Sequence, residues 1–397
     1  MNKQKIVASM LVVGGLVSPL AYATNGDEMM AVGSQNTALG GTGVANFVGA
    51  DSTWANPAML GKSKGAEVTG GVNLFKPEVD NSGMAGGALG DSTADTSYIP
   101  DVSYSNRIND SLTYGVAMAG IAGMGVDYTD ANPMLGLVKA KSALSILRVV
   151  ADVAYNKDNY GVGFAPIFQS GSLMLSYDAT AGGGVARNTA QSKSSSTGFG
   201  FALGGYYNAT NAVTVAAAYQ SKIAAKYGTQ ISAAGTGFGQ TFSDNLDQPA
   251  QIKLGVAFAV ADNLTLTADY KQIQWGSAAG YKDFGWQNQN ILAIGAKYSA
   301  SGYWLGLGYN HANDPIGVVS NPAVNMFNNM FFPAIVTNSY TFGGGYDISN
   351  ALAVEGAAVY TPKVTKTVSI AGIPGAAATN TTTHSQKALE VSLRYKF

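Results

Sequence analysis

The last ten residues of the chain, 388-ALEVSLRYKF-397, decide its fold. Apolar side chains alternate with polar or charged ones from Leu389 to the terminal Phe397. Successive side chains of a β-strand point to opposite faces, so this stretch predicts a strand with one apolar face and one charged face. What each face contacts depends on the rest of the chain.

Composition excludes several classes of protein. Of the 397 residues, 12% are charged and 50 are glycine, which is unusual for a soluble enzyme. The absence of cysteine excludes disulfides and thiolate metal sites, and His311 and His384 alone are too few for a histidine cage. We therefore expect no metal and no cofactor. A formal net charge of −1 does not indicate a nucleic-acid partner.

The N-terminus has the pattern of a secretory signal peptide. Lys3 and Lys5 form a basic region, residues 6–20 are uncharged and mostly apolar, and residues 21–23 (Ala-Tyr-Ala) match a small-x-small cleavage site. The apolar stretch is shorter than the roughly 20 residues of a membrane helix, which disfavours a retained anchor. We predict that residues 1–23 are removed. An exported protein of this kind is either secreted, located in the periplasm or inserted in the outer membrane as a barrel.

The alternation of the final stretch recurs along the chain, for example at 213–219, 252–258, 264–270 and 292–298. Many of these segments carry a tyrosine at one end, as the interfacial girdles of a transmembrane barrel do. Short breaks rich in Asn, Asp, Gly and Ser lie at 105–111, 155–160, 207–213, 260–264, 299–303 and 348–352. Longer connections alternate with them, at about 80–95, 129–145, 173–197, 228–248, 276–288, 311–337 and 362–384.

Six short turns and seven long loops predict 14 strands, an even number as in bacterial outer-membrane barrels. Because an unsatisfied backbone group in hydrocarbon costs several kcal/mol, such strands can span a membrane only if the sheet closes. The last strand must then pair with the first, with its apolar face to lipid and its charged face to the lumen. A soluble sandwich would also alternate, but it explains neither the turn rhythm nor the terminal Phe397.

Residues 24–64 lack this strand rhythm. They are rich in glycine and too few to fold alone. A barrel of 14 strands has a lumen too wide for its own side chains to fill. We therefore expect residues 24–64 to form a hatch inside the lumen and residues 65–397 to form the barrel. A periplasmic tail is the alternative.

Several motifs in this order resemble the FadL family of outer-membrane transporters for long-chain fatty acids and hydrocarbons. They are "TNG" (24–26), "ALGGTGVA" (38–45), "DSTWANPAML" (51–60) with the hatch motif Asn56-Pro57-Ala58, and, further along, residues 100–118, 248–276 and 305–316. The resemblance covers essentially the whole mature chain.

The resemblance implies an all-β barrel of 14 strands, plugged by an N-terminal hatch, in the outer membrane of a Gram-negative bacterium. Such a protein takes up hydrophobic molecules and releases them through a lateral opening in its wall. We expect it to contact outer-membrane lipid and lipopolysaccharide, to be monomeric, and to show its terminal Phe397 to the barrel-assembly machinery.

Strand parity places a set of charged side chains inside the lumen. A lysine or arginine on the lipid face near the midplane would cost about 2 to 4 kcal/mol, so the inward position is favoured. One interpretation is an ion-pair lattice that anchors the hatch. The other is that Arg148, Lys253 or Lys271 receives a fatty-acid carboxylate. The predicted inward set is Arg148, Asp152, Lys253, Asp269, Lys271, Glu355, Glu390 and Arg394.

Two further stretches are candidates for the transport path. Gly120, Gly123 and Gly125 lie within one predicted strand, where glycine often marks a bulge; they either form the lateral exit or pack closely against the hatch. The loop at 321–335, together with a possible short helix at 132–144, either forms a lid or offers a first apolar docking groove. Its candidate ligand contacts are Met326, Phe327, Met330, Phe331 and Phe332.

No catalytic motif supports an enzyme, and "GFGFALGG" (198–205) fits a strand better than a nucleotide loop. The sequence thus predicts a passive outer-membrane channel for hydrophobic small molecules. They are captured by extracellular loops, pass the hatch and leave through a kinked wall strand. The alternatives are a general diffusion porin for polar solutes and a barrel that serves as an adhesin or phage receptor.

Overall fold

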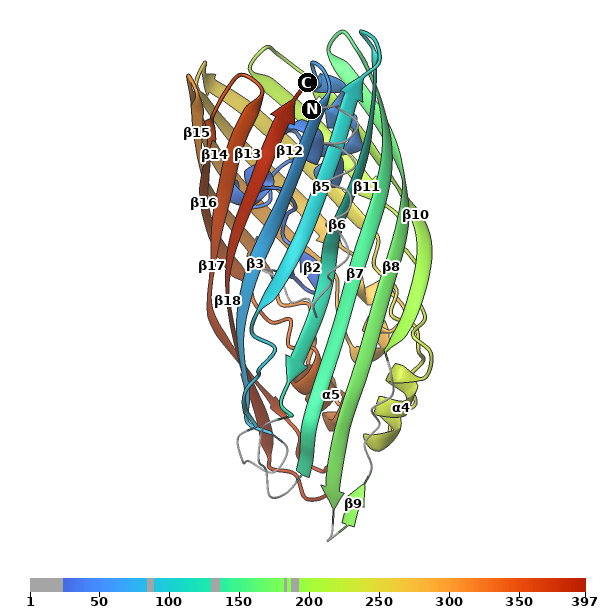
Figure 1. The fold of residues 1–397 in the computed structure, drawn as a ribbon. Helices are drawn as coiled ribbons and strands as arrows, with labels where there is room; N and C mark the ends of the chain where they lie inside the picture. Colours follow the sequence, from blue (N-terminus) through green and yellow to red (C-terminus); the bar gives the residue numbers. More distant parts are fainter. Residues whose placement is uncertain (1–23, 84–88, 130–135, 182–183, 187–192) are drawn as a thin grey trace.

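In the computed structural model, which describes residues 24–83, 89–129, 136–181, 184–186 and 193–397, the chain forms a closed antiparallel β-barrel (Figure 1). The predicted signal peptide, residues 1–23, lies outside the described residues. Fourteen wall strands pair with their neighbours in chain order, which confirms the predicted fold class. They are β3 (Glu67–Asn81), β5 (Ser97–Arg107), β6 (Leu112–Asp127), β7 (Gly136–Lys157), β8 (Tyr160–Ala181), β10 (Ser194–Asn208), β11 (Val213–Gln220), β12 (Gln251–Ala261), β13 (Leu264–Ile273), β14 (Gln289–Ala300), β15 (Tyr303–Ala312), β16 (Asn338–Asp347), β17 (Leu352–Ser369) and β18 (Thr379–Lys396).

The last wall strand, β18, pairs with the first, β3. Their register runs from Lys396 opposite Glu67 to Thr382 opposite Asn81, so the sheet closes on itself. On β18, Leu389 is 50% exposed on the outer face, whereas Glu390 is buried on the inner face. The alternation of the final ten residues therefore separates an apolar outside from a charged inside, as predicted.

Six short connections join the wall strands at one end of the barrel. They span residues 108–111, 158–159, 209–212, 262–263, 301–302 and 348–351. Each lies within a predicted short break, so the prediction of the turns is confirmed. Figure 1 shows the C-terminus at this end, while α4 (Gln230–Gly237), α5 (Pro322–Phe331) and the short strand β9 (Gly184–Ala186) lie toward the opposite end. Long loops and short turns thus separate to the two ends, as in outer-membrane barrels.

Several long connections are shorter than predicted. β7, β8, β17 and β18 extend through much of the predicted loops at 129–145, 173–197 and 362–384. The predicted short helix at 132–144 is wrong from Gly136 onward, where the chain belongs to β7; residues 130–135 lie outside the described ranges. Backbone pairing between β17 and β18, for example, runs from Leu352 opposite Tyr395 to Ser369 opposite Thr379 and so carries both strands into the predicted loop. Above the membrane such pairing needs no apolar face.

Residues 24–63, which we call the N-terminal segment, lie inside the barrel (Figure 1). Its polar side chains bond to different parts of the wall. Ser34 contacts Ser392 at 2.8 Å, and Thr53 donates to Asp152 at 2.8 Å. Because the wall supplies these partners, the segment needs no core of its own. Its elements are β1 (Thr24–Asn25), β2 (Glu28–Met29), α2 (Ser34–Ala38), η2 (Gly49–Asp51), α3 (Ser52–Ala55) and η3 (Pro57–Lys62).

The helices of the described residues are short. Within these ranges, none combines the length and the apolar character needed to cross a bilayer. α5 begins at a recognisable cap, because Asn321 Oδ1 accepts a hydrogen bond from Ala323 N at 3.0 Å and Pro322 occupies the first helical position.

Candidate ligand pocket in the lumen

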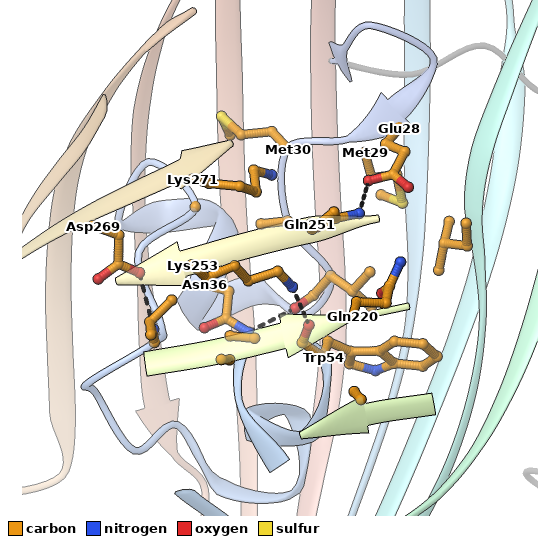
Figure 2. Close-up of a pocket in the computed structure, with 18 of the residues that line it drawn as sticks. Glu28, Met29, Met30, Asn36, Trp54, Gln220, Gln251, Lys253, Asp269 and Lys271 are labelled. Atoms are coloured by element: carbon orange, nitrogen blue, oxygen red, sulfur yellow. Dashed lines mark hydrogen bonds between the residues drawn. The ribbon is translucent and has the colours of Figure 1, made fainter. Parts of the chain in front are cut away.

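A cavity of about 100 Å³ lies between the N-terminal segment and the wall strands (Figure 2). Met29 and Met30 line it from the N-terminal segment, together with Trp54 of α3. Val150, Ile167 and Ile291 are among the wall side chains that complete its lining. The cavity is therefore mainly apolar and holds a few polar groups, which is the usual character of a small-molecule pocket.

The three cations predicted for ligand binding all line this cavity. Arg148 comes from β7, Lys253 from β12 and Lys271 from β13. Lys253 and Lys271 are register partners, so two like charges lie side by side, and Figure 2 shows both on adjacent strands. Like charges directly opposite each other destabilise a sheet. This pair therefore favours an anion between the two ammonium groups.

The two lysines have few partners. Lys253 Nζ donates to the carbonyl oxygen of Trp54 at 3.3 Å. Among the residues that the structure describes, neither Lys253 nor Lys271 forms an ion pair within 4.0 Å, although six other basic residues do. The nearest acid on β13, Asp269, is engaged elsewhere, because its Oδ2 accepts hydrogen bonds from the amides of Gly43 at 2.7 Å and Val44 at 2.9 Å.

Arg148 is better satisfied than the lysines. Its Nε donates to Gln169 at 2.9 Å, its Nη1 donates to Gln220 at 3.1 Å, and its Nη2 lies 3.5 Å from a carboxylate oxygen of Glu28. Gln251 donates to the other oxygen of Glu28. The Arg148 charge is thus largely neutralised, and the lysines are the more available cations.

On the opposite side of the lumen the charged residues pair with one another. Arg394 of β18 lies 2.9 Å from Glu355 and 2.5 Å from Glu67, and its contact with Asp51 is longer, at 3.8 Å. Burial raises the pKa of Asp51 to about 7, since the lowering effect of Arg394 is opposed by the nearby carboxylates of Glu355 and Glu67. Glu390 accepts a hydrogen bond from Thr37 at 2.8 Å. We call this set the ion-pair lattice; it joins the wall to the N-terminal segment.

The predicted hatch motif lies in the N-terminal segment beside the wall. Asn56 Oδ1 accepts from Ala58 N at 3.0 Å, which starts η3, and Asn56 Nδ2 donates to the carbonyl oxygens of Val44 at 2.8 Å and Gly205 at 3.3 Å. Pro57 lines the cavity. The motif therefore shapes the segment and fixes it to β10.

The three predicted exit glycines lie in β6, where the register shifts between Gly120 and Ala122. Such a shift marks a bulge. Gly123 stays in register with Ser145 of β7, and its amide donates to the carbonyl oxygen of Asp27 in the N-terminal segment at 2.9 Å, while Gly125 packs closely against the carbonyl oxygen of Ser142. The glycines thus sit at an interruption of the wall and also contact the N-terminal segment.

The five predicted apolar ligand contacts of the 321–335 loop lie in and just after α5, away from the cavity lining. All five are fully buried in this structure, at 0% or 1% exposure. Phe327 and Phe331 pack against Phe238, and Phe332 stacks on Phe284, from neighbouring loops. This arrangement is that of a lid, with no open groove at these side chains. Their contact with ligand stays a prediction.

Sequence reasoning missed several residues of the cavity. Glu28 and Trp54 belong to a segment without periodicity, so no parity rule places them. Gln220 and Gln251 lie at strand ends and share the inward parity of Lys253, a pattern that could have identified them. Within the described ranges, no group of His, Asp and Glu has the geometry to hold a metal ion.

The fold and the filled lumen define a class: outer-membrane β-barrels that transport small molecules. A family model described as "Outer membrane protein transport protein (OMPP1/FadL/TodX)" matches residues 17–397. The chain belongs to this family, and it is an outer-membrane barrel of a family of transport proteins. The resemblance stated from the motifs is therefore confirmed. A comparison with curated protein sequences gives no match.

Three solved structures of similar fold illustrate the likeness. A Pseudomonas aeruginosa FadL homologue has 16% identity and a TM-score of 0.75, over 94% of this chain and 100% of its own. The P. putida toluene transporter TodX has 18% identity and a TM-score of 0.70, over 93% and 99%. The Ralstonia pickettii toluene transporter TbuX has 18% identity and a TM-score of 0.67, over 93% and 99%. At these identities the likeness establishes the fold.

Proposed function

We propose that this protein is a passive channel that takes up hydrophobic small molecules, hydrocarbons or fatty acids, and holds them in the lumen cavity on their way. The observation that carries the proposal is the mainly apolar cavity between the N-terminal segment and the wall, in a barrel whose lumen the segment occupies. The toluene transporters of the same fold support a hydrophobic ligand. A filled lumen argues against a general diffusion porin.

Size limits what the cavity accepts as it stands. Its volume of about 100 Å³ is below the roughly 150 Å³ of a protein cavity that holds one benzene ring. A single-ring molecule therefore needs a small expansion, and a long acyl chain needs the N-terminal segment to move. Met29 and Met30 favour such adjustment, because methionine adapts to varied ligand shapes.

The proposed route has three steps. Ligand is first captured at the extracellular lid of α5, where Phe327 and Phe331 are the apolar contacts. It then passes the N-terminal segment into the cavity. It leaves sideways at the bulge of β6, near Gly120 and Gly123, into the outer membrane. This exit is supported by the interrupted ladder, since backbone away from regular pairing is tolerated at membrane depth only beside protein or a cavity.

The lysine pair gives the cavity a preference for acids over neutral molecules. A carboxylate between Lys253 and Lys271 would relieve their repulsion and form charge-assisted hydrogen bonds. Arg148, which is already paired with Glu28, would contribute less. The ligand class that follows is a hydrophobic molecule with one anionic group, with neutral hydrocarbons as weaker ligands.

Benzoate and toluene test this preference, because they share a ring and differ in the carboxylate. Lys271→Met and Lys253→Met should each weaken benzoate binding to the purified protein about tenfold or more, the loss of one charged hydrogen bond, and leave toluene binding unchanged. Arg148→Met should have a smaller effect on benzoate. An equal loss for both probes would reject the carboxylate role, and no saturable binding of either probe would reject the channel itself.

A further inference from the structure

The wall has a second interruption, between β10 and β11. β10 pairs with β8 along nearly its whole length, from Ser194 to Tyr207. Its pairing with β11 covers only the part nearer the short turns and stops where Ala202 faces Gln220. Residues 194–201 of β10 therefore have no ladder partner on that side.

Beyond Gln220 the chain continues as an extended run, residues 221–227, that stands beside β10 without joining it. Two contacts link them near the end of the ladder: Ser221 N donates to Phe201 O, and Phe201 N donates to Ser221 Oγ, both at 2.9 Å. Farther up, Lys226 N donates to Ser196 Oγ at 2.9 Å. We call the boundary between residues 194–201 and 221–227 the seam.

The backbone of β10 is unsatisfied along the seam. Amides of an antiparallel strand point alternately to its two neighbours, so those of Phe199 and Thr197 point the same way as that of Phe201. In the described part of the chain, no hydrogen bond joins either of them to residues 221–227. At membrane depth such groups are tolerated only beside protein or a cavity. The outward side chain of Phe199, which is 77% exposed, places this part of β10 at the level of the apolar outer surface.

Ile223 packs between the seam and the lining of the ligand cavity. Ile223 is fully buried and packs with Val150 and Ile167, both of which line the cavity. On its other side it fills the space left by two glycines of β10: a Cβ on Gly198 or Gly200 would lie 2.7 or 2.6 Å from its methyl and methylene carbons. The cavity lining itself reaches Ala202 and Gln220, the last pair of the ladder.

We propose that the seam is a second lateral opening, through which a hydrophobic ligand passes between the cavity and the bilayer when Ile223 moves aside. The inference rests on the proposed function, since it needs a ligand in the cavity. Gly200 lies 208 − 200 = 8 residues from the periplasmic end of β10, and Gly120 lies 120 − 112 = 8 residues from that of β6. The two interruptions thus stand at the same strand position on different parts of the wall.

Opening the seam breaks few interactions. Displacing residues 221–223 from β10 breaks the two hydrogen bonds of Ser221 with Phe201, and also the two backbone hydrogen bonds between Ile223 and Gln248 unless Gln248 moves with the segment. Parting β7 from β8 would break a ladder that runs from Gly136 to Lys157 with one register shift. Segments with few hydrogen bonds open locally at the lowest free energy. The seam should therefore open more readily than the β7–β8 boundary.

Engineered disulfides test the seam directly, because the natural chain has no cysteine. A Cβ on Gly200 would lie 2.8 Å from Ser221 Oγ, so the pair Gly200→Cys with Ser221→Cys can close the seam. Uptake of radiolabelled toluene by Gram-negative host cells lacking other members of the family is the readout. Oxidation should lower the uptake rate at least severalfold, and reduction of the same protein should restore it.

Two further pairs complete the design. Ser145→Cys with Ser172→Cys is the matched control: the two hydroxyls are 2.9 Å apart on β7 and β8, which remain paired in either state, so oxidation should leave uptake unchanged. Ser194→Cys with Gly228→Cys bridges the two segments farther up, where a Cβ on Gly228 would lie 3.6 Å from the Cβ of Ser194, and it serves if the first pair does not assemble.

The outcomes separate the two proposals. Loss of uptake on oxidation of either seam pair, with the control unaffected, supports the second opening. Normal uptake by a fully oxidised seam pair overturns it and leaves the β6 exit in place. If the unmodified protein takes up no toluene above cells without it, the proposed function fails instead.

Discussion

Among the described residues, buried charges are paired on one side of the lumen, and a pair of lysines is left without an ion pair on the other. On the side of β17, β18 and β3, Arg394 is held by Glu355 and Glu67 in the ion-pair lattice. On the side of β12 and β13, Lys253 and Lys271 face each other beside an apolar cavity. The first arrangement satisfies its charges within the protein and fixes the N-terminal segment. The second leaves charge for something else to satisfy, which is the property expected of a binding site.

Arg394→Ala should have the largest effect, because it leaves at least two buried carboxylates without their cation. Removing one partner of a buried pair typically lowers the free energy of unfolding by about 3 to 5 kcal/mol. Guanidinium unfolding of the detergent-purified barrel, followed by tryptophan fluorescence, measures this loss. If Arg394→Ala costs no more than Lys271→Met, the two sides do not differ as we describe.

The dependence of the unfolding free energy on pH tests one group of the ion-pair lattice, Asp51. The pKa of Asp51 is about 7 in the folded protein, because it is buried, and 3.8 is its ordinary value. The folded state therefore holds this proton more tightly, and its contribution to stability is full below pH 4 and is lost as the pH rises toward 7.

Asp51→Asn should remove this contribution. The variant should show a flatter dependence of unfolding free energy on pH between about 4 and 7, by at most about 1.4 kcal/mol per pH unit, the limit for one proton. The difference between the two curves reports the titration of Asp51 together with its electrostatic effect on the neighbouring carboxyls of Asp101 and Glu390. Parallel curves would mean that Asp51 is ionised throughout this range in the folded state.

Lys271→Met should have the smallest effect on stability and the opposite sign. It removes a like-charge contact with Lys253 and keeps a side chain of similar length, so the unfolding free energy should rise by roughly 0.2 to 1 kcal/mol. The same guanidinium titration measures it. A marked loss of stability would show that the Lys271 ammonium is paired within the protein and is not free for a ligand.

Much of the fold could be predicted because two of its signals are local in the sequence. They are the alternation of apolar and polar side chains along a strand and the number of short turns between strands. The six short turns and the closing strand at 388–397 follow from them. The parts of β17 and β18 near the long loops do not follow from these signals. Polar runs such as 379–386 pair with the neighbouring strand without any apolar alternation in the sequence. α5 could have been predicted from Asn321 and Pro322, a recognisable start of a helix that the sequence analysis passed over.

The site was predictable only on its wall side. Parity placed Arg148, Lys253 and Lys271 in the lumen, and the structure brings all three to one cavity. It could not place Trp54, because the N-terminal segment takes its shape from the wall around it. Nor could it reveal the seam, since residues 221–227 continue to alternate in exposure after the ladder pairing with β10 has stopped.

The pairing of β18 with β3 sets an order on biogenesis. The strand that seals the barrel is synthesised after the other thirteen wall strands, and its partner lies about 300 residues earlier, at Glu67–Asn81. Contacts between such distant segments form late in folding. The N-terminal segment must therefore already lie between the strands when the ends meet, or it would be left outside a finished cylinder. A polypeptide released before β18 is complete could not close the barrel around the N-terminal segment.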